Sequence, residues 1–441
     1  MYMPTSLLTV AARLLAVGVE VDLCDDNLAQ CSLECDVLGV NLVGAPYVGR
    51  ALELRHRLKE RGRKSRFVLG GQVVSGFAPN EIRELFGEDT LNGNDDERLA
   101  SAVGVDVRAV PLPEMTSLID AYELLSDEWM SLYLANEFSL FVSQGCKYQC
   151  TFCPAQRTKY DNVTGKIQRV NESYRDSAII EKDLRYLVER AQRLGFDRLR
   201  LYLSNLDLFQ TPSRLREFMN LVRGVRTSSG GSIIAMRGLS TVASFLQVHR
   251  SQPGIIEEAV QAGLQRVGFG VDGATAQVWL ATRKPQSGAM PAEAIAVARQ
   301  KYGLTPETLM VFGHSGIDTD SSLAQAVEFT KAMWDEHGSL PRPHVAKTVV
   351  PGNDAWHDPA FRHVVRALLD WPTGFQSLDF TALPSPLTHP ERELRELTSK
   401  YYLEVCGMPG AVTRYVLPEL PDMSSDDVRY VREFNKCRYD I

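Results

Sequence analysis

Three cysteines, Cys146, Cys150 and Cys153, lie in one short stretch of this 441-residue chain. Their spacing is C-x-x-x-C-x-x-C, and Phe152 directly precedes the last of them. Three thiolates in one loop can ligate three irons of a [4Fe–4S] cluster, which leaves the fourth iron open to a chelating molecule. The preceding apolar run FSLFV predicts a buried strand, and Gly145 lets the chain turn into the loop.

Other uses of three close cysteines are less consistent with the sequence. A zinc site needs a fourth ligand, and no further Cys or His follows the loop before His249. A disulfide is not expected in a chain that carries no secretion signal. An iron–sulfur electron carrier or redox sensor remains an alternative to an enzyme. The loop alone does not distinguish the two, but the elements around it bear on the choice.

Strand and helix patterns alternate six times from residue 138 onward. The expected strands are 138–142, 198–205, 232–238, 265–273, 308–316 and 344–352, each followed by a helical pattern or a loop. Six such units predict a partial (β/α)6 barrel, and sites in barrels of this kind lie at the carboxyl ends of the strands. Several polar residues fall at those ends.

The cysteine loop and its flanks resemble the radical S-adenosylmethionine (radical SAM) superfamily. The family motif, C-x-x-x-C-x-aromatic-C, is matched by Cys146, Cys150, Phe152 and Cys153. The resemblance implies that the three cysteines hold a [4Fe–4S] cluster and that the amino and carboxylate groups of SAM chelate its open iron. It also implies that the main chain near Phe152 meets the adenine, and that an external donor such as flavodoxin or ferredoxin supplies electrons.

The first 105 residues have the pattern of a doubly wound, Rossmann-like α/β domain. Strands are expected at 19–27, 35–43 and 65–73, with helices between them. The third strand ends in Gly70-Gly71, where a ligand can approach the backbone closely. The segments DVLGVNLV and FVLGG resemble the cobalamin-binding domain that precedes the barrel in one large radical SAM class.

Two departures leave cobalamin binding open at this stage. The family domain opens with a strand before its first helix, whereas here the first predicted element is a helix. The family's Asp-x-His-x-x-Gly motif is absent, and the only histidine before the cysteine loop is His56, inside a predicted helix. Either the natural chain starts before Met1, or the domain is a scaffold that holds no cobalamin.

The second and third barrel strands end in residues of interest. Ser204, Asn205 and Asp207 close the second strand, where the resemblance implies contacts to the ammonium group of SAM. A carboxylate suits that role, although Asn and Asp also shape turns. Arg237 is expected at the end of the third strand, near a substrate or SAM carboxylate or in a structural ion pair.

The fourth strand ends in a Gly-x-Gly-x-Asp pattern. Gly268 and Gly270 would let the backbone approach the nucleoside of SAM, and the resemblance implies a cofactor contact for Asp272. Arg283 and Lys284 match a basic pair that recurs in the family, and a solvated surface position is an equally good interpretation of both.

His314 follows the fifth strand and could contact substrate or act as an acid or base. Pro351-Gly352 follows the sixth strand and resembles a family turn that borders the SAM site. The catalytic candidates are therefore His314 and Arg237, and the remaining strand-end residues are candidates for cofactor binding.

Composition narrows the possible partners and the organisation of the chain. The net charge of −7 predicts no broad basic face for nucleic acid, and no apolar run is long enough to span a membrane. Eight cysteines without a secretion signal favour a reducing cytoplasm. Four parts are expected: the domain at 1–105, a connector at 106–137, the barrel at 138–384 and a helical segment at 385–441.

The leading hypothesis is a radical SAM enzyme that transfers a methyl group, by way of cobalamin, to a small molecule, with a peptide as second choice. One alternative assumes no cobalamin and transfers the 3-amino-3-carboxypropyl group of SAM to a soft nucleophile such as trivalent arsenic. A ring-forming or rearranging radical enzyme is another.

Overall fold

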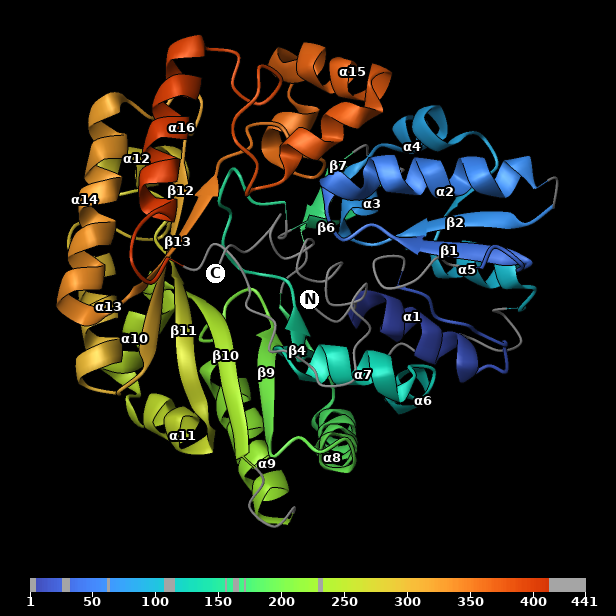
Figure 1. Cartoon of the computed structure of the whole chain (residues 1–441), viewed down its shortest axis with the longest axis horizontal. Coiled ribbons are helices and arrows are strands. Elements are labelled where there is room, and N and C mark those ends of the chain that lie inside the picture. The colour runs from blue at the N-terminus through green and yellow to red at the C-terminus, as the bar shows by residue number, and fades with distance from the viewer. Residues whose placement is uncertain are drawn as a thin grey trace.

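The computed structural model describes most of the chain. The described residues are 5–25, 32–61, 64–106, 116–154, 157–161, 166–169, 172–228 and 233–411. Figure 1 shows two parallel sheets side by side, one built from the N-terminal residues and the other from the middle of the chain. The predicted α/β fold class is therefore confirmed.

The N-terminal sheet has three parallel strands in sequential order. They are β1 (Val37–Asn41), β2 (Arg66–Gly70) and β3 (Thr90–Asn92), and α2 (Val48–Glu60) and α4 (Pro79–Phe86) lie in the connections. The strand expected at 19–27 is wrong, because the described residues 19–25 form no strand. In the described residues β1 is the edge strand of this sheet, and residues 19–25 do not pair with it.

The second sheet has six strands, and every neighbouring pair is parallel. In spatial order they are β4 (Phe138–Phe141), β9 (Arg198–Ser204), β10 (Ile233–Thr241), β11 (Leu264–Gly270), β12 (Thr305–Phe312) and β13 (Leu340–Val345). Helices in the connections include α8 (Ser177–Arg193), α9 (Pro212–Ser228), α11 (Gly254–Ala262), α13 (Met290–Gln300) and α14 (Asp320–His337). The predicted six-unit partial barrel is confirmed, and the carboxyl ends of its strands face one edge.

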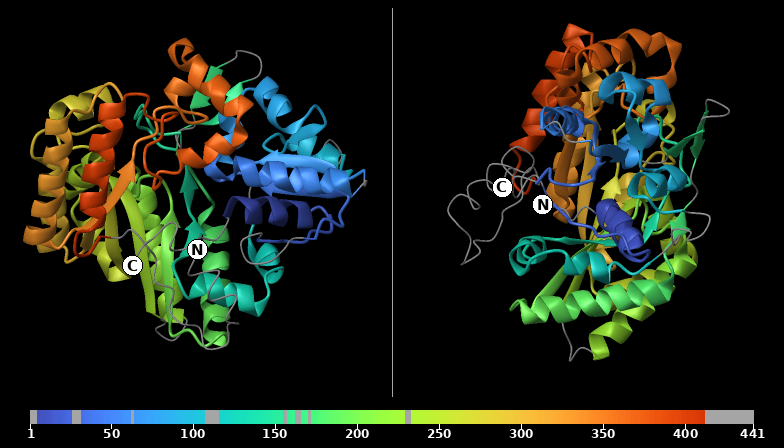
Figure 2. Two further views of the ribbon diagram at one scale, coloured as in Figure 1. Left: turned by 45° about the horizontal axis from the view of Figure 1, so that its top comes forward. Right: turned by 90° about the vertical axis from the view of Figure 1, so that its right-hand side faces the viewer.

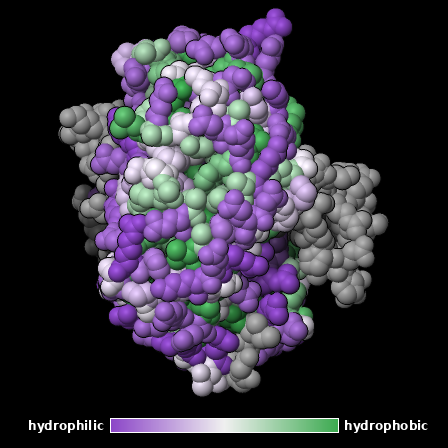
Figure 3. All heavy atoms as spheres, turned by 90° about the vertical axis from the view of Figure 1, so that its left-hand side faces the viewer, coloured by the Kyte–Doolittle hydropathy of each residue, from purple (hydrophilic) through white to green (hydrophobic). Residues whose placement is uncertain are grey.

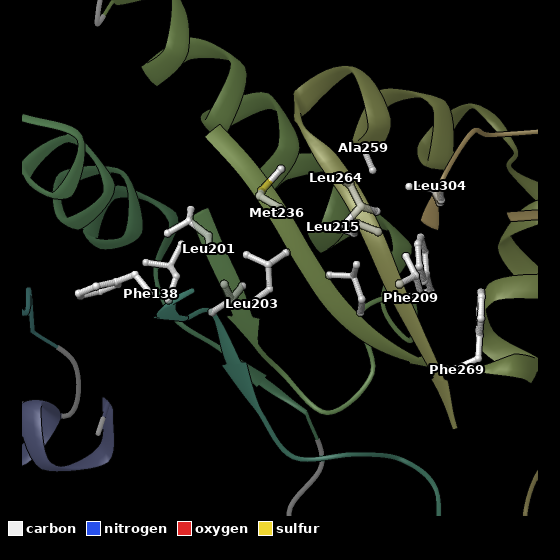
Figure 4. Packing of buried hydrophobic residues seen from close by; sticks show 14 of the residues in the cluster. Phe138, Leu201, Leu203, Phe209, Leu215, Met236, Ala259, Leu264, Phe269 and Leu304 are labelled. Atoms are coloured by element: carbon white, nitrogen blue, oxygen red, sulfur yellow. The ribbon is translucent and has the colours of Figure 1, made fainter. Parts of the chain in front are cut away.

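Apolar side chains of the strands and helices form one large core. Leu203 of β9, Met236 of β10 and Phe269 of β11 are at most 2% exposed. Figure 4 shows such side chains from neighbouring strands lying close together beside the helices. Burying each of them contributes about 1.5–3 kcal/mol, which holds the strand ends in fixed relative positions.

The N-terminal domain shares a second core with residues that follow β13. Phe77 contacts Trp356 and Phe375, with ring centroids 5.4 and 5.9 Å apart. The indole Nε1 of Trp356 donates a hydrogen bond of 3.0 Å to Oε2 of Glu81 in α4. Figures 1 and 2 show this orange part of the chain, with α15 (Arg362–Asp370), against the blue N-terminal domain. The two segments form one packed unit.

Gly76, the last residue of α3 (Gln72–Gly76), lies where the two segments touch most closely. A Cβ atom at Gly76 would lie 2.4 Å from the amide nitrogen of Gly352 and 2.4 Å from the carbonyl carbon of Pro351. Gly76→Ala should therefore lower the free energy of unfolding by about 1–3 kcal/mol or more, because two backbone segments must separate.

Gly49→Ala in α2 is the matched control, since nothing lies within 4 Å of a Cβ atom there. Alanine is the better helix former, so this variant should be as stable as the parent or up to about 1 kcal/mol more stable. Thermal unfolding of both variants measures the contrast, and equal stabilities would contradict the close packing at Gly76.

The connector and the C-terminal segment are largely helical where the structure describes them. The connector holds α6 (Ile119–Glu123) and α7 (Asp127–Leu134), and α16 (Arg392–Cys406) follows the barrel as expected. The rest of the helical segment expected at 385–441 lies outside the described residues, which end at 411. Among the helices of the described part, none is long and apolar enough to cross a membrane. Figure 3 shows a face on which polar residues are mixed with scattered apolar ones.

Candidate iron–sulfur and SAM site

The cysteine loop leaves the barrel directly after its first strand. β4 ends at Phe141, and Gly145 has a φ of +89°, a left-handed conformation that suits glycine and turns the chain into the loop. Cys150 is buried, and Cys146 and Cys153 are half-buried. All three thiols therefore lie at the carboxyl edge of the sheet, as the sequence predicts.

The thiols are close enough to affect one another. Burial, with added repulsion from the other thiols and from Asp207, raises the pKa of Cys146 to about 12, and burial raises the pKa of Cys150 to about 11. Iron binding would displace these protons. In the described residues, no three His, Cys, Asp or Glu side chains converge as ligands of a single metal ion. In a cubane cluster each cysteine binds a different iron, and the three thiols of this loop are a donor set of that kind.

Hydrogen bonds fix the loop from three sides. The side-chain amide of Gln210 accepts from the Lys147 amide and donates to the Gly145 carbonyl, both at 3.2 Å, so it brackets Cys146. On a second side, the Tyr148 and Ser244 hydroxyls share a hydrogen bond of 2.9 Å. On the third side, the Thr151 amide donates to the Thr282 carbonyl at 3.1 Å.

Gln210 was not singled out in the sequence, and the structure makes it testable. Gln210→Leu removes both hydrogen bonds that bracket Cys146, at a cost of about 1 kcal/mol each, and leaves two loop groups unsatisfied. We expect the reconstituted variant to lose its iron several-fold faster to a chelator than the parent does. Gln247→Leu, at an exposed position in α10 (Val242–Ser251), is the control and should retain iron normally. Equal iron loss from both variants would contradict the anchoring role.

Two of the predicted cofactor contacts lie at the end of β9, and their hydrogen bonding differs. Asn205 is 4% exposed, and in the described part of the chain its buried Oδ1 has no hydrogen-bond partner. Asp207 is fully buried, and its carboxylate accepts from the Thr241 and Ser240 hydroxyls at 2.9 and 3.1 Å and from the Thr241 amide at 3.3 Å. Asp207 thus joins the β9 turn to the end of β10, while Asn205 keeps an acceptor for a ligand. Ser204, the last residue of β9, is half-buried.

Arg237 does not end its strand, so that prediction is wrong. β10 continues to Thr241, which places Arg237 in mid-strand. Its Nε and Nη2 donate to the carboxylate of Glu307 on β12 at 2.8 and 2.7 Å. Arg342 of β13 binds the same carboxylate at 2.6 Å. Arg237 is therefore part of a buried ion-pair network between strands, which argues for a structural role.

The end of β11 holds another buried ion pair. Gly268 lies within the strand, where a Cβ atom would meet Leu239 and Leu309 at 2.8 Å. Asp272 follows the strand and binds the ammonium of Lys284 at 2.5 Å. Gly270 makes room for this pair, because its Cβ would lie 2.8 Å from Lys284 Nζ.

His314 lies beside the cysteine loop. Its ring is 5.3 Å from the ring of Phe152, measured between centroids, and its side chain is buried. Burial lowers the pKa of His314, although the carboxylates of Asp318 and Asp272 oppose this, so the imidazole is neutral near pH 7. Among the described residues its Nε2 has no hydrogen-bond partner. A neutral imidazole nitrogen is thus available beside Phe152.

The turn after β13 also reaches the loop. Gly352 has a φ of +96°, and a Cβ atom on it would lie 3.7 Å from the Pro154 side chain. Pro351 and Gly352 are both buried. The structure therefore brings this turn to the cysteine loop on one side and to Gly76 of the N-terminal domain on the other.

Gly70 and Gly71 end β2 at the edge of the N-terminal sheet. Gly71 has a φ of +102°, and a Cβ atom there would lie 2.4 Å from Oδ1 of Asn41 at the end of β1. Asn94 accepts a hydrogen bond from the Gly71 amide and donates one to the Gly71 carbonyl, both at 2.9 Å. The buried amide oxygen and nitrogen of Asn41 have no partner in the described residues, which fits a polar ligand at this edge.

Sequence reasoning missed three of these residues. Gln210 and Asn41 carry no motif, and only their hydrogen-bonding environment reveals them. Lys284 was given an equal chance of being surface charge, yet its side chain is 6% exposed. The neighbouring Arg283 does match that expectation, since it is exposed and pairs with Asp354.

The fold is similar to that of known radical SAM structures. No family model matches the sequence, and no curated protein matches it. The structure of the radical SAM methyltransferase TsrM from Kitasatospora setae, with cobalamin and a [4Fe–4S] cluster bound, has a TM-score of 0.58 at 15% identity. That alignment covers 80% of this chain and 74% of TsrM.

A second solved structure covers more of the chain. The cobalamin-dependent SAM radical enzyme OxsB aligns with a TM-score of 0.57 at 14% identity, over 99% of this chain. The chain spans 61% of the length of OxsB. The predicted resemblance to cobalamin-dependent radical SAM enzymes is thus confirmed at the level of structure, over an N-terminal α/β domain and a partial radical SAM barrel together.

Proposed function

We propose that this chain is a radical SAM enzyme that transfers a methyl group to a small molecule. The observation that carries the proposal is the three-cysteine loop at the carboxyl end of β4, in the position where a partial barrel places its site. The loop is accompanied by two buried polar atoms without partners among the described residues, Asn205 Oδ1 and His314 Nε2.

The residues at this edge have distinct roles in the proposal. Cys146, Cys150 and Cys153 would hold the cluster, with SAM bound beside it. Bound there, the cluster supplies the electron that cleaves a carbon–sulfur bond of the sulfonium. Asn205 accepts a hydrogen bond from the SAM ammonium, and the main chain at Phe152 receives the adenine.

His314 is the candidate group toward substrate. Because its imidazole is neutral and buried, Nε2 can accept a proton or a hydrogen bond from a bound molecule without first losing a proton of its own. Its place beside Phe152 would put that molecule next to the SAM site.

The N-terminal domain would hold cobalamin, which supplies a transferable methyl group when bound. Asn41 offers an amide without a partner in the described residues at the edge of the sheet, and Gly70-Gly71 leaves the backbone open to close approach. His56 cannot serve from this edge, because it lies in α2, exposed and paired with Glu60. The cobalt would therefore receive no histidine from it.

A small molecule is the substrate class that we propose, with a peptide second. The net charge of −7 does not favour nucleic acid. The TsrM structure is described with a tryptophan substrate, which shows that this fold can accept a molecule of that size in TsrM. Electrons would come from a flavodoxin or ferredoxin.

Anaerobic reconstitution tests the proposal. We expect about four irons per chain, cobalt retained after desalting with added cobalamin, and 5′-deoxyadenosine among the SAM products. Iron without cobalt, together with methylthioadenosine, would instead support transfer of the aminocarboxypropyl group. A cluster without any SAM binding would leave an iron–sulfur redox protein, and absence of iron would reject the proposal.

A further inference from the structure

Lys284 is a buried cation at the centre of the site. It follows α12 (Ala276–Ala281), and its amide donates a hydrogen bond of 2.8 Å to the Trp279 carbonyl. Its side chain is 6% exposed. The ammonium lies against Gly270, where any side chain would collide with it. A position shaped in this way is not one of a solvated surface lysine.

Asp272 holds the ammonium in place. The distance between Lys284 Nζ and Asp272 Oδ2 is 2.5 Å. Asp272 has a φ of +50°, a conformation that is uncommon for residues other than glycine. Such conformations persist where the surroundings enforce them, and they cluster at functional sites. The geometry of this pair is thus set by the end of β11.

The pair lies beside the cysteine loop. The Thr151 amide, between two of the cysteines, donates a hydrogen bond to the Thr282 carbonyl at 3.1 Å. The Lys284 ammonium interacts electrostatically with the thiols of Cys150 and Cys153. The carboxylate of Asp272, 2.5 Å from the ammonium, compensates the buried positive charge of Lys284.

The ammonium has more donors than the polypeptide uses. A lysine carries three N–H groups, and in the described part of the chain its partner is Asp272. Buried donors are almost always satisfied, so the remaining N–H groups call for an acceptor beyond those that the described residues supply. Thiolates and sulfides of an iron–sulfur cluster are anionic acceptors of this kind.

We propose that Lys284 is a positioning residue that donates to the anionic iron–sulfur cluster and favours its reduced form. This inference rests on the proposed function, because it needs the cluster to be present. Reduction adds negative charge to the cluster, and its potential depends on net charge and on hydrogen bonds to the sulfur atoms. A fixed cation beside Cys150 and Cys153 therefore stabilises the reduced state.

The two members of the pair give opposite predictions, which separates this role from a structural one. Lys284→Met leaves the Asp272 charge beside the cluster, so the ratio of reduced to oxidised cluster at a fixed poised potential should fall by roughly tenfold. Asp272→Asn leaves the cation alone, so the same ratio should rise by a similar factor. A merely structural pair would lower stability in both variants without shifts of opposite sign.

The measurement is a redox titration of the reconstituted protein followed by electron paramagnetic resonance, with iron content and thermal unfolding recorded for each variant. Lys284→Arg keeps the charge and should stay within about threefold of the parent. Arg283→Met removes an exposed neighbouring charge, which solvent screens, so its ratio of reduced to oxidised cluster should also stay within about threefold of the parent.

Each outcome decides the proposal. Equal ratios for Asp272→Asn and the parent would overturn it, even if Lys284→Met fails to fold. A shift that occurs only after SAM is added would assign the ammonium to the SAM carboxylate and overturn the cluster assignment. A parent protein that binds no iron would reject the proposed function itself, whereas four bound irons with unshifted variants would reject Lys284 alone.

Discussion

Cys150→Ala is expected to leave the chain unable to hold the proposed iron–sulfur cluster and therefore unable to cleave SAM. Cys150 is the buried member of the three, and with two thiolates the loop can ligate only two irons. We expect iron to fall from about four per chain to below one after anaerobic reconstitution, and SAM products to fall to background. Cys146→Ala and Cys153→Ala should behave in the same way.

Two half-buried cysteines provide the controls. Cys35 lies in the N-terminal domain and Cys406 ends α16. Replacing either with alanine should leave the iron content and the cluster spectrum unchanged. Normal iron in all three loop variants would refute the site, and iron loss in the controls would point to a cluster held elsewhere.

Glu307→Gln should destabilise the barrel strongly. The carboxylate is fully buried and binds Arg237 and Arg342, so a neutral amide removes the negative charge that the two buried guanidinium groups share. Breaking a buried pair of this kind costs about 3–5 kcal/mol. Thermal unfolding should show a Tm lower by roughly 3–10 °C. Glu293→Gln, in the exposed pair with Arg250, is the control and should change stability by at most about 1 kcal/mol.

The pKa of Glu307 predicts how the stability difference between the parent and Glu307→Gln depends on pH. Burial alone would raise its pKa, but Arg342 and Arg237 lower the pKa of Glu307 to about 2, from an ordinary value of 4.5. Its contribution to stability is therefore complete above about pH 4.5 and is lost as the pH falls toward 2. The gap in unfolding free energy between the parent and Glu307→Gln should narrow across that window, and a constant gap would contradict the ion-pair explanation.

The strands of the barrel could be predicted because parallel strands covered on both faces are nearly continuous apolar runs. Their ends were harder to place. Gly238 marked the end of β10 in the sequence, yet the strand passes through it to Thr241, because the glycine lets the Leu208 side chain approach. A Cβ atom on Gly238 would lie 2.9 Å from Leu208 Cδ2. Because of this long-range contact, β10 is longer than the sequence predicts, and Arg237 lies within the sheet and not at its end.

The candidate site also contains residues that the sequence predicts and residues that it does not. Cys146, Cys150 and Cys153 were predictable because spacing within one loop is local information. His314 could be placed at a strand end, but its proximity to Phe152 depends on how two distant strands converge. Lys284 could not be recognised, because its burial depends on the space that Gly270 leaves. Residues that act through distant neighbours carry no signal in their own segment.

The core shared by Phe77, Trp356 and Phe375 has a consequence for synthesis on the ribosome. The N-terminal domain leaves the exit tunnel first, but the residues that complete its core come after all six strands of the barrel have been translated. At about 5–20 residues per second, this wait lasts tens of seconds. During it, Phe77 and its neighbours expose apolar surface to water, so the nascent chain should bind holdase chaperones until residue 375 has emerged.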